Sequence, residues 1–194
     1  TTLRGLGKIP GLTRFLCAHW LYTDAVNTVI LFMAVYATKV GGLTSPEVTN
    51  LLALSTIFAI VGAFGAGPLI DRYGAKRALY VALACWVVAL NLTIAASGKG
   101  TLYLAGPILG AALGSTWAAD RVLMFRLSPP EALGELYGIY GMIGRFAAIT
   151  GPLVWGATVY ALEDTGALAY RVAISALLAM LLAGAWVLRR VPAH

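Results

Sequence analysis

Long runs of apolar residues alternate with short polar connections along the chain. Residues 51–70 contain no charged side chain, and neither do residues 78–97. A helix of about 20 residues, rising about 1.5 Å per residue, crosses about 30 Å of hydrocarbon. The other apolar runs of suitable length are approximately residues 15–38, 101–119, 128–162 and 167–188. The pattern predicts an all-α polytopic membrane protein with six transmembrane helices.

The composition supports a membrane protein and excludes a water-soluble globule. Hydrophobic residues make up 60% of the chain and charged residues 11%, whereas soluble domains carry about 25% charged residues. The net charge is +6, but the basic side chains lie at the ends of apolar runs instead of forming one stripe. We therefore expect a lipid bilayer as partner and no nucleic acid. Cys17 and Cys85 lie inside apolar runs and are expected to be small buried hydrophobes.

The basic residues also predict the orientation in the membrane. Six spans place both termini on one side, and ten of the 14 Lys and Arg residues fall on that side. An excess of basic residues in short loops marks the cytoplasmic side, so both termini are predicted to be cytoplasmic. We expect residues 1–14 to form a cytoplasmic lead-in or linker, residues 15–190 the transmembrane domain and residues 191–194 a tail. The chain begins with Thr1 and not Met, and we expect it to be part of a longer protein.

Two helix starts carry the same local pattern. Thr44 and Glu47 have the spacing of a capping box, with a proline between them. Ser128 and Glu131 repeat this spacing around two prolines. The fifth helix is therefore predicted to start at Ser128 and to run without interruption to about Leu162.

Small residues recur at helical spacing in the fourth and fifth spans. Such stripes let a neighbouring helix approach closely in lipid. They consist of Gly106, Gly110 and Gly114 in the fourth span, and of Gly138, Gly141 and Gly144 in the fifth.

Asp24 and Arg145 are the clearest charges at bilayer depth. Each lies about ten residues inside a span that starts on the terminal side, which places both at about 15 Å depth. Because an unpaired charge there costs several kcal/mol, we expect the two to form an ion pair. Together with Asn27, one turn beyond Asp24, they are the candidate substrate or proton site. The alternative is a static ion pair that fixes helix packing.

Three further polar residues complete the candidates. His19 lies five residues before Asp24 and could relay a proton or simply fill a packing position. Asp120 and Arg121 end the predicted fourth span and are expected to form a gate or structural charge network. No catalytic, phosphate-binding or metal-binding motif is present, so we expect neither an enzyme nor a metal or other cofactor.

The connection between the second and third spans has the sequence GPLIDRYGAKR. Gly74 suits the turn because glycine accepts a positive φ. The pattern resembles the loop signature of the major facilitator superfamily, in which it joins the second and third helices of a six-helix half. The resemblance implies that the loop latches one conformational state. The residues that match the signature are Gly67, Asp71, Arg72, Gly74, Lys76 and Arg77.

Further motifs extend this resemblance over nearly all of residues 15–190. The sequence YTDAVNT at residues 22–28 is similar to a seventh-helix motif, and the segments LSPP, GELYGIY and GPL are similar to a block of the vacuolar-effluxer-like branch, named for an autophagy-related permease. The chain departs from that branch in having Ala25 for Gly, Arg145 for Lys, and Ala-Asp-Arg at 119–121 for Ser-Arg-Ser. Since arginine does not lose its proton as lysine can, Arg145 is better suited to anchor an anion than to carry a proton.

The resemblance implies the C-terminal six-helix half of a transporter, built as two inverted three-helix repeats. It also implies that the first and fourth spans line a central cavity and that the first and fifth are neighbours. The expected function is secondary active transport of a small solute, such as an amino acid or another carboxylate, by proton-coupled alternating access. The alternative is a transport-inactive subunit with a structural or assembly role in a larger membrane complex. The expected partner is a second six-helix half or other membrane subunits, and the expected location is a bacterial inner membrane.

Overall fold

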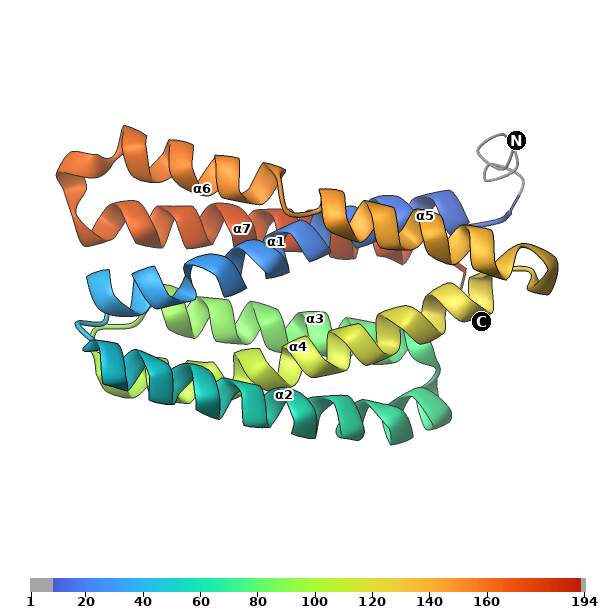
Figure 1. Ribbon diagram of the computed structural model, residues 1–194, viewed down its shortest axis with the longest axis horizontal. Coiled ribbons are helices and arrows are strands. Elements are labelled where there is room, and N and C mark those ends of the chain that lie inside the picture. Colours follow the sequence, from blue (N-terminus) through green and yellow to red (C-terminus); the bar gives the residue numbers. More distant parts are fainter. Residues whose placement is uncertain (1–8, 193–194) are drawn as a thin grey trace.

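Six helical spans run along the long axis of the molecule (Figure 1). The structure is a computed structural model and describes residues 9–192. Within this part of the chain, six spans are long and apolar enough to cross a membrane, and the fifth is divided into two helices. The helices are α1 (Leu12–Lys39), α2 (Ser45–Tyr73), α3 (Ala75–Ile94), α4 (Lys99–Leu127), α5 (Leu133–Phe146), α6 (Thr150–Ala161) and α7 (Ala167–Arg189), with short 3-10 turns at Pro130–Ala132 and Glu163–Thr165.

The helices form two packed groups. α2, α3 and α4 lie together on one side of the molecule, and α1, α5, α6 and α7 lie on the other (Figure 1). α1 contacts both α5 and α6, which agrees with the expectation that the first and fifth spans are neighbours. The predicted all-α architecture with six spans is confirmed. Residues 1–8 of the predicted lead-in and residues 193–194 of the predicted tail lie outside the described residues.

The glycine stripe of α4 packs closely against a neighbouring helix, as predicted, and the structure shows that this helix is α2. A side chain at Gly110 would collide with the Ser55 carbonyl oxygen, and one at Gly114 would collide with that of Ala59. The backbones of the two helices therefore approach closely, as packing in lipid favours. The stripe of α5 differs, because Gly138 and Gly141 have no neighbour at the position of a Cβ atom.

The two predicted helix starts have different outcomes. Thr44 and Glu47 form the capping box, in which the Thr44 amide donates to Glu47 Oε2 at 2.8 Å. Ser128 does not cap the fifth span: its hydroxyl donates to the Met124 carbonyl oxygen, at the end of α4. That prediction is wrong because α4 continues to Leu127, eight residues beyond the predicted end at Ala119, and the serine completes its last turn.

The prediction of one unbroken fifth helix is also wrong. α5 ends at Phe146 and α6 begins at Thr150, so backbone groups on both sides of this break lack partners within their own helices. Pro152 favours the break, because a proline lacks an N–H group and its ring would collide with the Ala148 carbonyl group of a continuous helix. A proline alone does not interrupt a helix of this chain, since Pro68 and Pro107 lie inside the unbroken helices α2 and α4.

Candidate functional site

A cavity of about 220 Å³ lies between α1, α4 and α5. Its lining combines polar and titratable side chains from three helices, and its position agrees with the expectation that the first and fourth spans line a cavity. The residues that line it are His19, Thr23, Val26, Asn27, Thr116, Trp117, Asp120, Arg121, Tyr140, Gly141 and Gly144.

Asp120 is the centre of a buried hydrogen-bonded cluster beside this cavity. Its side chain is only 2% exposed. Its carboxylate accepts hydrogen bonds from the hydroxyl groups of Tyr22 and Tyr140, the latter at 2.6 Å. His19 Nδ1 lies 3.0 Å from Asp120 Oδ2. Donors from α1 and α5 thus hold a carboxylate of α4 that would be costly to bury alone.

Asp120 therefore plays a different part from the one expected. We predicted a gate or charge network at the mouth of the bundle, next to Arg121. Arg121 is exposed at the cavity, but Asp120 points into the bundle and bonds to His19 and the two tyrosines. This arrangement could not be predicted from the sequence, because charges at the end of an apolar run normally mark the membrane boundary.

His19 is oriented by this cluster. Its side chain is 3% exposed, and its ring stacks on that of Tyr140 at 4.3 Å between centroids. Because a carboxylate only accepts hydrogen bonds, the contact with Asp120 places a proton on Nδ1. The other ring nitrogen, Nε2, is buried without a hydrogen-bond partner. A Cβ atom at Gly144 would lie 3.4 Å from Nε2, so the glycine leaves space beside this nitrogen at the cavity.

Asp24 does not form the predicted ion pair with Arg145. Both of its carboxylate oxygens lie 2.9 Å from the amide nitrogen of Gly151, in the first turn of α6. The Asp24 side chain is fully buried, whereas Arg145 is exposed near the end of α5. The prediction is wrong because the break in the fifth span supplies an unpaired N–H group, and a carboxylate is favourable at the positive end of a helix.

Asn27 holds the other side of the same break. Its side-chain amide donates to the Ala147 carbonyl oxygen at 2.9 Å, at the end of α5. Asp24 and Asn27, one turn apart on α1, thus satisfy groups on both sides of the interruption. Gly151 fits here because any side chain would collide with the Thr28 hydroxyl group and crowd Asp24. Two residues predicted to bind substrate are therefore bonded to the protein backbone.

The loop motif forms the junction of α2 and α3. Gly74 alone separates the two helices and has φ of 86°, as the sequence predicted. Lys76 donates to the carbonyl oxygens of Arg189, at 3.2 Å, and Val191, and so caps the end of α7. A cavity of about 330 Å³ at this junction is lined by Ile70, Asp71, Tyr73, Gly74, Lys76, Arg77 and Arg126. Of the other motif residues, Gly67 has open space at its Cβ position and Arg72 stacks on the ring of Tyr73.

Comparison with known proteins gives a consistent family assignment. Residues 15–194 match the model of the Major Facilitator Superfamily. An uncharacterised MFS-type transporter of Bacillus subtilis is 24% identical over 81% of this chain and 36% of its own length. A probable 4-methylmuconolactone transporter of Cupriavidus pinatubonensis is 30% identical over 61% of this chain and 28% of its own length.

A further relative is the autophagy-related protein 22 of Botryotinia fuckeliana. It is 25% identical over 81% of this chain and 26% of its own length. The chain thus spans about a third or less of the length of these three relatives.

Proposed function

The chain belongs to the major facilitator superfamily, and from this premise we propose that it forms one six-helix half of a secondary transporter. In this proposal, a small solute crosses the membrane by alternating access, as a second half rocks against this one around a shared site. Relatives named as transporters support a membrane transporter. We further propose that the chain belongs to the vacuolar-effluxer-like branch of this superfamily. Its similarity to an autophagy-related protein supports this assignment.

The buried pair of His19 and Asp120 is the observation that carries the proposal. Ionisable groups inside a transmembrane bundle are costly and mark ion or substrate pathways. The pair lies beside a cavity, and His19 Nε2 has no protein partner. A neutral imidazole with its Nδ1 proton directed at a carboxylate is a good proton acceptor at its other nitrogen. We therefore assign proton coupling to His19 and Asp120, and not to Asp24.

The cavity also suggests the class of solute. Arg121 is the cation among the lining residues, whereas Arg145 is absent from the lining. A guanidinium group binds a carboxylate with good geometry. We therefore transfer the proposed role of anion anchor from Arg145 to Arg121, and propose a small carboxylate-bearing solute such as an amino acid.

The surface supports a second half as partner. α2 is buried at only five positions, and its exposed face carries large apolar side chains such as Ile57, Phe58, Ile60, Val61 and Phe64. We propose that a second six-helix half covers part of this face, within an integral membrane protein whose termini are cytoplasmic. The cytoplasmic placement is supported by the basic residues on the terminal side.

Proton flux in proteoliposomes tests the proposal. The full-length protein is reconstituted with a pH-sensitive dye inside the vesicles, and the twenty common L-amino acids and a set of small carboxylates are added outside. We expect at least one solute to drive proton movement with the wild type. His19→Gln should reduce solute-driven proton flux at least tenfold, because glutamine cannot accept a proton at neutral pH.

Tyr36→Phe serves as a matched control. It removes another buried hydroxyl, which donates to the Thr93 carbonyl oxygen away from the cavity, and should keep most of the flux. Undiminished flux in His19→Gln would exclude His19 as the coupling group. Absence of flux with every solute, together with co-purification of unrelated membrane subunits, would support the structural role instead.

A further inference from the structure

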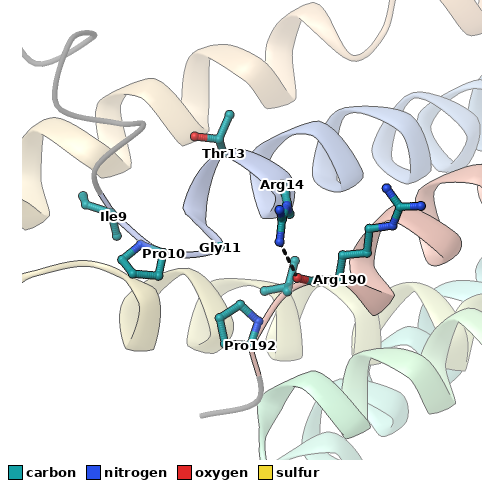
Figure 2. Close-up of a pocket in the computed structure, with 8 residues that line it drawn as sticks. Ile9, Pro10, Gly11, Thr13, Arg14, Arg190 and Pro192 are labelled. Carbon is teal, nitrogen blue, oxygen red and sulfur yellow. Dashed lines mark hydrogen bonds between the residues drawn. The ribbon is translucent and has the colours of Figure 1, made fainter.

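A third cavity lies where the start of α1 meets the end of α7 (Figure 2). Its volume is about 590 Å³, and the described residues that line it are Ile9, Pro10, Gly11, Thr13, Arg14, Arg190, Val191 and Pro192. The two chain segments are in close contact here, since a side chain at Gly11 would collide with Pro192. The cavity is separate from the proposed solute site between α1, α4 and α5.

Two arginines border this cavity without an acidic partner. Arg14 donates from its guanidinium group to the Arg190 carbonyl oxygen at 3.3 Å (Figure 2). No Asp or Glu is among the described residues that line the cavity, and within residues 9–192 neither Arg14 nor Arg190 forms an ion pair. Lys76 already bonds to carbonyl oxygens at the end of α7. The positive charge of this region is therefore not balanced by neighbouring carboxylates.

An apolar stripe runs along α7 up to Arg190, which borders this cavity. Leu182, Trp186 and Arg190 follow one another at intervals of four residues and so lie along one side of the helix. Leu182 is 47% exposed and Trp186 is 56% exposed. The Arg190 guanidinium carbon lies 4.1 Å from the centroid of the Trp186 ring. Tryptophan beside arginine at the end of a membrane span is typical of the level of the lipid headgroups.

We propose that this cavity binds the phosphate of an anionic phospholipid, with an acyl chain along Leu182 and Trp186. A phosphate group would accept hydrogen bonds from Arg14 and Arg190, which replaces the missing acidic partner. The lipid, and not free phosphate, is the expected ligand because the apolar stripe continues from the cations into the hydrocarbon. Basic pockets between transmembrane helices bind anionic headgroups in this way.

Native mass spectrometry of the full-length protein in detergent tests this site. Phosphatidylglycerol and phosphatidylcholine are titrated separately, and inorganic phosphate is added alone in a third arm. The test variant is Arg14→Gln/Arg190→Gln. Because both arginines would donate charge-assisted hydrogen bonds to the phosphate, the double variant should bind phosphatidylglycerol at least about 10-fold more weakly than the wild type.

The control is Arg72→Gln/Arg77→Gln, which lowers the net charge equally on the same side of the membrane. It should retain wild-type affinity for phosphatidylglycerol. In case the test variant fails to fold, Arg14→Lys/Arg190→Lys should keep the preference for phosphatidylglycerol over phosphatidylcholine with reduced affinity. Equal binding of both lipids by the wild type, an equal loss in the control, or competition by millimolar phosphate alone would overturn the proposal.

Discussion

Replacement of Asp24 by asparagine separates a structural role for this residue from a role in proton transport. In the structure, both oxygens of the buried carboxylate lie 2.9 Å from the amide nitrogen of Gly151. A hydrogen bond to a charged acceptor contributes about 1.5–3 kcal/mol, and a neutral one about 0.5–1.5 kcal/mol. Loss of the charge at the start of α6 removes about another 0.3–1 kcal/mol. We therefore expect Asp24→Asn to weaken the attachment of α6 by about 2 kcal/mol.

Hydrogen–deuterium exchange measures this attachment directly. An effect of about 2 kcal/mol corresponds to a roughly 30-fold increase in local opening. The increase should be confined to a peptide that covers the first turn of α6, beginning at Thr150. Asp120→Asn is the control, because it removes another buried carboxylate that bonds to His19 and tyrosines but not to α6.

The opposite result is equally informative. If Asp24→Asn leaves exchange at Gly151 within about 3-fold of the wild type, the carboxylate does not act as a charged cap. If solute-driven proton flux is then abolished as well, Asp24 would be the coupling group, and the assignment to His19 would be wrong.

Two further substitutions test the packing and the loop motif. Gly110→Ala should lower the thermal unfolding temperature, because the forced separation of α2 and α4 reduces the folding free energy by about 1–3 kcal/mol. Gly65 has open space at its Cβ position, so Gly65→Ala should leave the unfolding temperature unchanged or slightly higher. Equal effects of the two substitutions would exclude close packing as the cause. Lys76→Met should destabilise the end of α7 by about 1 kcal/mol and accelerate amide exchange there. Arg77→Met removes the neighbouring exposed cation and should not change this exchange. Equal exchange rates in the two variants would show that Lys76 does not stabilise the end of α7.

The regular features of the fold follow from the sequence. The six spans, the Thr44 capping box and the turn at Gly74 depend on hydrophobicity and local backbone preferences, which act within a few residues of each other. The close packing of α2 on α4 was also predictable, because the Gly106–Gly110–Gly114 spacing places three small residues on one side of a helix.

The polar contacts of the interior could not be predicted in the same way. Equal depth in the membrane suggested a pair of Asp24 and Arg145, but depth does not fix the direction in which a side chain points. The break before Gly151 gave Asp24 a nearer partner. Pro152 favours a break at this place, but a proline does not predict one by itself, because Pro68 and Pro107 lie inside unbroken helices. The cluster of Asp120 with Tyr22 and Tyr140 depends on three helices meeting, for which the sequence contains no short-range pattern.

The junction at Gly74 has a mechanical consequence for the whole bundle. Only Gly74 separates α2 from α3, so a tilt of either helix is expected to displace the adjoining end of the other helix. Lys76, in the first turn of α3, donates a hydrogen bond to the Arg189 carbonyl oxygen at the end of α7. A displacement of α3 is therefore also expected to act on the end of α7. We therefore expect a movement of α2 to displace the start of α3 and, through Lys76, the end of α7.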